Sequence, residues 1–453
     1  MTRDEDTRSR LWAIRPWHIA VILLCILMIA IGALRVTRRV RLHNRIEAVR
    51  AKGYPVTLAQ LNAWYPAPPA GENAADYIMQ AIARLRIPPS KEKEQVPLLD
   101  AFRLLPRRQS LDDQTKSALV KLIDDNTDAL HLLEQAARIE HCRYAIDLTS
   151  RDNMRVPSIS GFSNIVGLLC FKAALHMEQT EVGPAVDATI CAYRTAGSLA
   201  KEPVVISRAL GRVCQLRATG ILERILSRTS VDAGQLEHLE QTLATAYDPN
   251  GLERTFISEQ CFMLDNFRRS MSLSSIPPSE NLSFVRFQMA RISGAVDLAE
   301  IRYIDWIDRY LTVIRLPHRE RVQAVTDIQR ERNRLGDQQV LLHTIMPAFY
   351  GFIMSDVEDL AQLLTARTAL AVERYRLATG RLPGRLTDLV PTYLEHVPED
   401  PFDGQPLRYR RLEKGYVVYS IGRDVRDNGG TELVSGQKGR RQPDADVTFI
   451  VER

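Results

Sequence analysis

The sequence predicts a mainly α protein in three parts: an N-terminal transmembrane helix, an α-hairpin (solenoid-like) helical domain and a small C-terminal α+β module. An apolar run near the N-terminus, apolar residues at helical spacing through most of the chain, and prolines, glycines and short β-type runs after Gly380 predict this arrangement. The expected parts are a tail over 1–16, the transmembrane helix over 17–34, a juxtamembrane helix and Pro-rich linker over 35–110, the helical domain over 111–355 and the module over 356–453.

Residues 17–34 read WHIAVILLCILMIAIGAL and carry no charge after His18. At a rise of 1.5 Å per residue, such a helix spans roughly 27 Å, close to the thickness of the hydrocarbon core. Trp12 and Trp17 stand where interfacial aromatic residues belong, and arginines flank both ends. A cleaved signal peptide is the alternative, but its apolar region would be shorter and would end in a small-residue site. We therefore predict an uncleaved, single-pass membrane anchor.

The charges beside this run leave its orientation open. Basic residues are fewer before the run than after it: Arg3, Arg8, Arg10 and Arg15 precede it, and Arg35, Arg38, Arg39, Arg41, Arg45, Arg50 and Lys52 follow it. The positive-inside rule would keep the C-terminal side in the cytoplasm, yet long domains cross the membrane with little regard to charge. We expect a protein of the inner (cytoplasmic) membrane with its soluble part outside the cytoplasm, because of the C-terminal module described below.

Composition excludes some classes of protein. The chain is 45% hydrophobic and 25% charged, which is typical of a globular protein with a sizeable core. Its 60 basic residues are scattered among 55 acidic ones, whereas a nucleic-acid-binding protein more often gathers its basic residues on one face, so we expect no nucleic-acid partner. The one dense basic run, from Arg35 to Arg50, adjoins the apolar run and is better explained by a membrane surface.

Six cysteines are present, none in a C-x-x-C pair, so neither a zinc site nor a redox motif is indicated. Cys25 lies in the apolar run, which leaves an odd five for the soluble part. We interpret these as buried free thiols, with one or two disulfides as the alternative.

Helices are expected from about Leu111 to Ala378. The basic run can continue the membrane helix to Lys52, where Gly53-Tyr54-Pro55 breaks it. One apolar helical face repeats at i, i+3, i+4, i+7 and i+11 from Val166 to Met177, and Asp232 is a plausible helix N-cap. Paired helices joined by short turns suggest a solenoid-like array.

Proline, glycine and tyrosine motifs dominate the C-terminal part. They are ERYRLATGRLP (373–383), VPEDPFDGQPLRY (397–409) and GYVVYSIGRDVRDNGG (415–430), followed by DADV (444–447). In their order and spacing, the residues from about 361 to 453 resemble the C-terminal head of the major pseudopilin of bacterial type II secretion systems. The resemblance covers about a fifth of the chain and implies a small α+β head.

The resemblance also implies a cofactor. Major pseudopilins bind Ca²⁺ in the matching loop, and Asp424, Asp427 and Asp446 fall on the matching positions, with Asn428 and Asp444 as further oxygen donors. Calcium takes six to eight oxygen ligands from carboxylates, amides and backbone carbonyls. The alternative is a solvated Asp/Asn/Gly turn that binds no metal.

The chain departs from the pseudopilin pattern at its N-terminus. The apolar run has no acidic residue and no prepilin-peptidase site, and about 325 residues separate it from the module. We therefore expect a helical membrane protein that has acquired the head domain rather than a pilus subunit.

No catalytic motif is present: H-E-x-x-H, G-x-S-x-G, a Walker-type loop and G-x-G-x-x-G after a strand are all missing from the sequence. We interpret His141-Cys142, the acidic stretch of Glu253, Glu259 and Asp265, and the aromatic set Tyr303, Trp306 and Tyr310 as ordinary helix and packing residues. The expected function is a non-enzymatic, membrane-anchored scaffold that binds the bilayer and other envelope or secretion proteins. The alternative is an envelope hydrolase whose active site is assembled from residues far apart in sequence.

Overall fold

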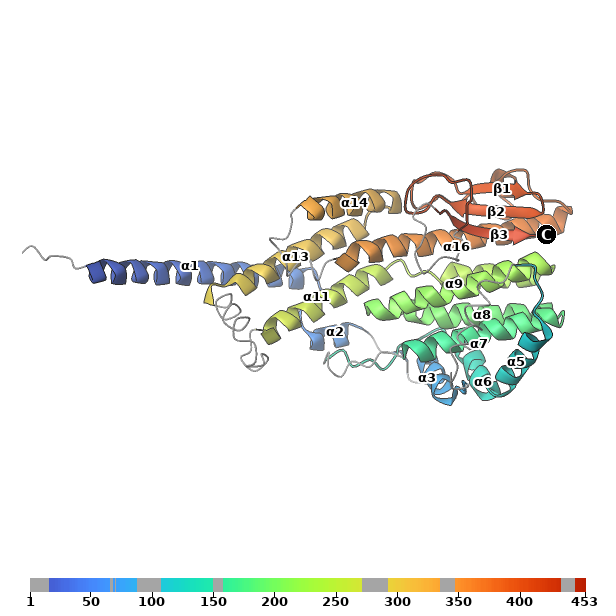
Figure 1. Cartoon of the computed structure of the whole chain (residues 1–453), viewed down its shortest axis with the longest axis horizontal. Coiled ribbons are helices and arrows are strands. Elements are labelled where there is room, and N and C mark those ends of the chain that lie inside the picture. The colour runs from blue at the N-terminus through green and yellow to red at the C-terminus, as the bar shows by residue number, and fades with distance from the viewer. Residues whose placement is uncertain are drawn as a thin grey trace, which may run out of the picture. The chain divides into compact units, whose positions relative to one another are not determined.

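The computed structural model describes residues 16–65, 68–69, 71–87, 107–149, 158–270, 292–334, 347–432 and 445–453. Within these ranges the chain is mainly helical, with a small antiparallel sheet near the C-terminus, as the sequence predicts (Figure 1). The α-helices are α1 (Pro16–Ala51), α2 (Leu58–Trp64), α3 (Ala74–Arg84), α5 (Asp113–Asp124), α6 (Thr127–Ala136), α7 (Ile159–Glu178), α8 (Val182–Ser198), α9 (Val205–Arg228), α10 (Ala233–Thr245), α11 (Gly251–Ser270), α13 (Ala295–Ile314), α14 (His318–Arg334) and α16 (Pro347–Thr379). The 3₁₀ turns are η1 (Leu199–Lys201) and η4 (Leu386–Leu389), and the strands are β1 (Arg408–Leu412), β2 (Gly415–Ser420) and β3 (Val447–Glu452).

Helix α1 is continuous over 36 residues. Its apolar stretch has a mean hydropathy of 2.8 and is exposed along its length, with Leu24 58% and Met28 62% accessible. Among the described helices α7 is also long and apolar enough to cross a bilayer, but it is 61% buried and forms core instead. The prediction of a membrane-length apolar helix over 17–34 is confirmed. The helix then runs on to Ala51, and Gly53 ends it with a φ of +77°.

The chain divides into two compact units, Met1–Thr57 with Gln260–Asp308 and Leu58–Glu259 with Arg309–Arg453. In the first unit, the part of α1 beyond the apolar stretch packs with the end of α11 and the start of α13. One cluster of its core joins four buried aliphatic side chains: Val49, Val56, Leu264 and Ile304. Segments more than 200 residues apart therefore share one small core.

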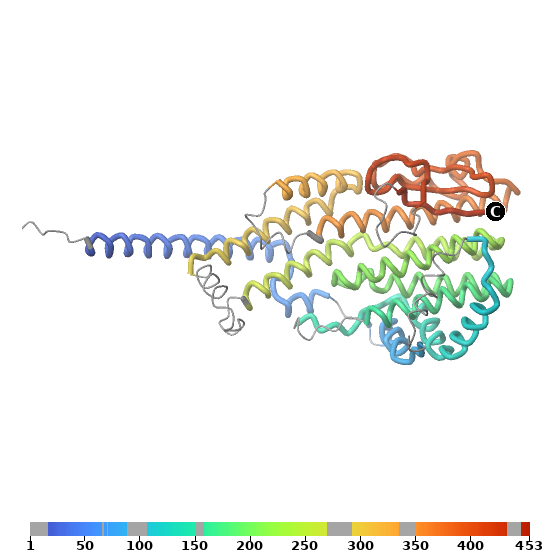
Figure 2. The backbone as a smooth tube through the Cα atoms, in the orientation of Figure 1, coloured from blue at the N-terminus to red at the C-terminus, as the bar shows by residue number. Residues whose placement is uncertain are grey.

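In the second unit, α7, α8 and α9 pack successively on one another, as Figure 2 traces in green. Nearly every apolar residue of α7 is buried, including Val166 and Met177 at the ends of the predicted face. The predicted N-cap is confirmed. The Asp232 carboxylate accepts a hydrogen bond from the Gln235 backbone amide at 2.9 Å, and the Gln235 side-chain oxygen accepts one from the Asp232 backbone amide. Helix α16 packs against α10, α14 and the sheet.

The sheet has the order β1-β2-β3, with both pairs antiparallel. The central strand β2 is buried along its whole length, and α16 packs against β2 and β3. The Tyr416 hydroxyl of β2 donates to the Ala369 carbonyl at 3.1 Å and to a Glu373 carboxylate oxygen at 3.0 Å, which fixes the strand on the helix.

Helix α9 covers the outer edge of β3. The amide of Ile450 donates to a Glu223 carboxylate oxygen at 2.8 Å, and the amide of Glu452 donates to the Ser227 hydroxyl at 3.0 Å. These bonds satisfy edge groups that would otherwise be open to another chain. The sheet thus packs on the helices of the second unit, which are called the helical array below. The domain boundary predicted between 355 and 356 lies inside α16, and this helix packs both on α10 of the array and on the sheet.

We expect Glu223→Ala to lower the free energy of unfolding by about 2–3 kcal/mol. The change removes the acceptor of the Ile450 amide and a partner of the buried Arg107 guanidinium, whose Nε lies 3.1 Å from the Glu223 carboxylate. Ser227→Ala should cost about 1 kcal/mol. Urea unfolding of the full chain in detergent measures both. The exposed Glu237 of α10, changed to alanine, is the control, and equal midpoints for Glu223→Ala and Glu237→Ala would show that α9 does not hold the edge.

Candidate functional site

The predicted calcium loop follows β2, and its last residues lie beside the start of β3. Ser420 at the end of β2 pairs with Val447 of β3, so Asp446 comes next to the loop that begins at Ile421. The Asp446 carboxylate is 1% exposed and accepts three backbone amides, those of Gly430 at 2.7 Å, Thr431 at 3.2 Å and Asn428 at 3.4 Å. Burial raises the pKa of Asp446, and the three amides oppose that rise. Asp446 therefore closes the loop as a hydrogen-bond acceptor.

The other predicted ligands bond locally within the loop. Asp424 accepts the side-chain amide of Asn428 at 3.0 Å and the backbone amide of Arg426 at 3.2 Å. Asp427 accepts the Gly429 amide at 2.9 Å, and its other carboxylate oxygen lies 4.0 Å from the Arg408 guanidinium. Each carboxylate thus serves its own backbone or a cation.

The structure brings Asp424 next to Asn428, and Asn428 next to Asp446, but it does not bring the carboxylates around one point. Within the described ranges, no group of three or more His, Cys, Asp or Glu side chains has the spacing of a metal site. The fifth predicted ligand, Asp444, lies outside the described residues. Oxygen donors suited to Ca²⁺ are present, but in this conformation they are directed elsewhere.

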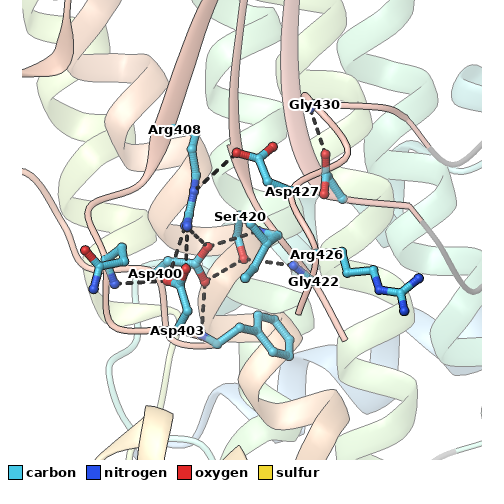
Figure 3. Close-up of polar contacts among 12 residues, drawn as sticks. Asp400, Asp403, Arg408, Ser420, Gly422, Arg426, Asp427 and Gly430 are labelled. Carbon is cyan, nitrogen blue, oxygen red and sulfur yellow. Dashed lines mark hydrogen bonds and ion pairs between the residues drawn. The ribbon is translucent and has the colours of Figure 1, made fainter. Parts of the chain in front are cut away.

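Asp400 lies close to this loop and bonds to residues of two segments of the module (Figure 3). It is fully buried, and its carboxylate accepts the amides of Phe402 at 3.0 Å and Ile421 at 2.9 Å and the hydroxyl of Ser420 at 2.8 Å. Arg408 donates to the same carboxylate at 2.6 Å. In the sequence, Asp400 stands out only as part of the motif VPEDPFDGQPLRY (397–409). The structure shows that it joins the turn before β1 to the end of β2.

Arg408 extends this network towards the predicted ligands. Its guanidinium also pairs with Asp403 and lies near Asp427, so one side chain lies beside two carboxylates in the turn before β1 and one in the loop after β2 (Figure 3). The pKa values of the pair respond accordingly: the hydrogen bond from Arg408 holds the pKa of Asp403 low against the effect of burial, and the carboxylates raise the pKa of Arg408.

Arg423 anchors the same loop to the helices. It donates to the Ser355 hydroxyl at 2.8 Å and to Glu358 at 3.0 Å on α16. Glu358 also pairs with Arg212 of α9, which in turn binds Asp359. One turn earlier on α9, Arg208 pairs with the buried Asp356, which also accepts bonds from Arg321 at 3.3 Å and Tyr247 at 2.9 Å. A largely buried ion network therefore runs from the candidate loop through α16 to α9.

A second set of polar groups surrounds Glu202, which follows η1. Its Oε1 accepts the Tyr65 hydroxyl at 2.6 Å and the Tyr144 amide at 3.1 Å, while its Oε2 has no hydrogen-bond partner among the described residues. Burial raises the pKa of Glu202 to about 7 despite these two donors. No local sequence pattern predicts this cluster, because its members are up to 137 residues apart.

Glu202 also affects the thiol of the neighbouring Cys142. Burial, with the nearby Glu202 carboxylate, raises the pKa of the Cys142 thiol to about 12, which keeps it protonated and disfavours a nucleophilic role. Tyr303, Trp306 and Tyr310 are all buried, as expected of packing residues. The six cysteines are free, and Cys170, Cys191, Cys214 and Cys261 are buried, which confirms the interpretation as buried free thiols for these four.

Comparison with protein-family models, with curated proteins and with solved structures found no match.

We expect Glu202→Gln to change the pH dependence of stability. The pKa of about 7 in the folded state lies above the ordinary 4.5, so the protonated acid favours the fold below pH 4.5 and this advantage is lost as the pH rises to 7. Glutamine cannot ionise and keeps an oxygen acceptor. The variant should therefore be more stable than wild type by about 1–3 kcal/mol near pH 8 and nearly equal to it near pH 5.

Urea unfolding at a series of pH values measures this difference. The exposed Glu140, changed to glutamine, is the control and should leave the profile of wild type unchanged. A constant offset between Glu202→Gln and wild type from pH 5 to pH 8 would mean that Glu202 does not titrate in this range.

Proposed function

We propose that this chain is a single-pass inner-membrane protein whose soluble part lies outside the cytoplasm and acts as a binding or scaffold protein. In this proposal α1 crosses the bilayer, the helical array offers a surface to other envelope or secretion proteins, and the C-terminal part is a pseudopilin-like, Ca²⁺-binding head.

The observation that carries the proposal is the way the head is joined to the array. Helix α16 packs on the sheet and on α10, while α9 caps the edge of β3. A head that lies at the end of a flexible linker would move independently of the array. Here the shared helix and the edge bonds fix one to the other, which suits a protein that presents a fixed surface.

The pseudopilin resemblance is supported by the arrangement of the motif residues. A long helix lies against a three-stranded antiparallel sheet, the Asp400-Pro401 turn is tied to β2, and the Asp/Asn/Gly loop follows β2 directly. Asp424, Asp427 and Asp446 would hold the calcium ion. Its positive charge would balance the negative charges of the three carboxylates. For this, Asp427 has to turn away from Arg408.

We expect Ca²⁺ to stabilise the full chain. Extracellular-type calcium sites have dissociation constants of roughly 10⁻⁴ to 10⁻³ M, so about 5 mM Ca²⁺ should add about 1–2.5 kcal/mol to the free energy of unfolding. This corresponds to a rise of a few degrees in melting temperature. Mg²⁺ should do little, because it demands strict octahedral geometry and retains its waters.

Thermal unfolding of the full chain in detergent, with Ca²⁺ or with chelator, measures the effect. Asp424→Ala and Asp427→Ala should abolish the shift without unfolding the protein, since Asp424 is only partly buried and Asp427 is exposed, while Glu413→Ala in the β1–β2 turn should keep it. The calcium assignment fails if wild type melts at the same temperature in Ca²⁺ and in chelator.

We expect a reporter fused after Arg453 to be active only outside the cytoplasm. The secretion-type head favours this orientation, whereas the seven basic residues that follow the apolar run favour the opposite one. Paired fusions to a reporter that works in the periplasm and to one that works in the cytoplasm give the measurement. Activity of the cytoplasmic reporter alone would show that the basic residues decide the orientation.

A further inference from the structure

Six of the seven basic residues from Arg35 to Lys52 form two sets, and the seventh, Arg50, pairs with Glu47. Arg38, Arg45 and Lys52 are seven residues apart and share one face of the helix. This face meets the segment that leads into and includes α13: Arg38 donates to the Ser293 carbonyl at 2.8 Å, Arg45 pairs with Asp305 at 3.1 Å, and Lys52 pairs with Asp308. The first set is therefore used inside the first unit.

The second set is Arg35, Arg39 and Arg41. All three are exposed, and no carboxylate in the described part of the chain pairs with them. Arg35 directly follows the apolar stretch, and Arg41 is seven residues beyond it, about 10 Å along the helix. The headgroup region adds roughly 5–8 Å to each side of the hydrocarbon core, and a long arginine side chain can reach back towards it.

Acidic groups near this end of the first unit do not offset the second set at the surface. Where α13 begins, Gly294 lies against Arg35 and Arg38 of α1. The first acidic residues after it, Asp297 and Glu300, are only 7% and 5% exposed. Burial also raises the pKa of Glu300 to about 7, so part of its charge is lost near neutral pH. Among the described residues, the accessible charge that follows the apolar stretch is positive.

We propose that Arg35, Arg39 and Arg41, which project on more than one side of α1 at headgroup depth, bind the headgroups of anionic lipids of the phosphatidylglycerol type. The proposal rests on the proposed membrane crossing of α1. It follows from the position of the three guanidinium groups at headgroup depth and from the absence of a protein partner for them among the described residues. Phosphate is the preferred ligand of a guanidinium, and a lipid phosphate is the anion that the bilayer places at this depth.

The test uses the full chain reconstituted into phosphatidylcholine vesicles with a trace of spin-labelled lipid. Electron paramagnetic resonance reports the fraction of labelled lipid that is immobilised on the protein, for phosphatidylglycerol and for phosphatidylcholine separately. Wild type should prefer phosphatidylglycerol, on the order of fivefold for each arginine engaged, and high salt should weaken the preference. An excess of soluble glycerol phosphate should not abolish it, because the three arginines are at the bilayer.

Two matched triple variants separate the sets. Replacement of Arg35, Arg39 and Arg41 by glutamine should remove the preference and leave the melting temperature nearly unchanged. Replacement of Arg38, Arg45 and Lys52 by glutamine should keep the preference and lower the melting temperature. Equal immobilisation of the two lipids by wild type, or a preference that survives the first triple change, overturns the proposal while α1 still crosses the membrane. No immobilised lipid of either kind would overturn the membrane crossing as well.

Discussion

The edge of β3 is the constraint on which the second unit depends. An edge strand presents unpaired amides and carbonyls that are open to another chain, and at β3 the side chains of Glu223 and Ser227 of α9 take the place of a fourth strand. With β3 held, its pairing with β2 fixes where Asp446 meets the loop, and β2 in turn carries Ser420 and Ile421 to the carboxylate of Asp400. Each turn of the candidate site is therefore positioned by a helix that is about 200 residues earlier in the chain.

The ion network adds a second connection between the same parts. Buried charges are costly to desolvate, and they persist only where several partners share them. Arg423 brings the loop to Glu358, Glu358 shares Arg212 with Asp359, and α9 is thereby tied to α16. A change in the loop that displaces Arg423 would leave Glu358 with one partner fewer.

Local sequence patterns predicted the helices and their ends, but they did not predict which distant side chains contact one another. The apolar run, the end of α1 at Gly53 and the N-cap at Asp232 are signals carried by neighbouring residues. The partners of Asp400, Glu202 and Arg423 lie far away in sequence, and a single sequence carries no record of which distant side chains meet. The same limit explains the domain boundary: the pattern changes after Gly380, but α16 is buried by the array and by the sheet, and no local feature marks a division.

In the first unit, different interactions determine the stability of the helix packing and its register. The pair Arg45–Asp305 is about half exposed on both sides, and such pairs contribute about 0–1 kcal/mol each. Burial of an aliphatic side chain contributes about 1.5–3 kcal/mol, so Val49, Val56, Leu264 and Ile304 outweigh the ion pairs. Apolar contacts tolerate a shift of one helix along another, whereas charges at a seven-residue spacing do not. The ion pairs therefore favour one register of α13 on α1, and in that register Arg35, Arg39 and Arg41 stay exposed.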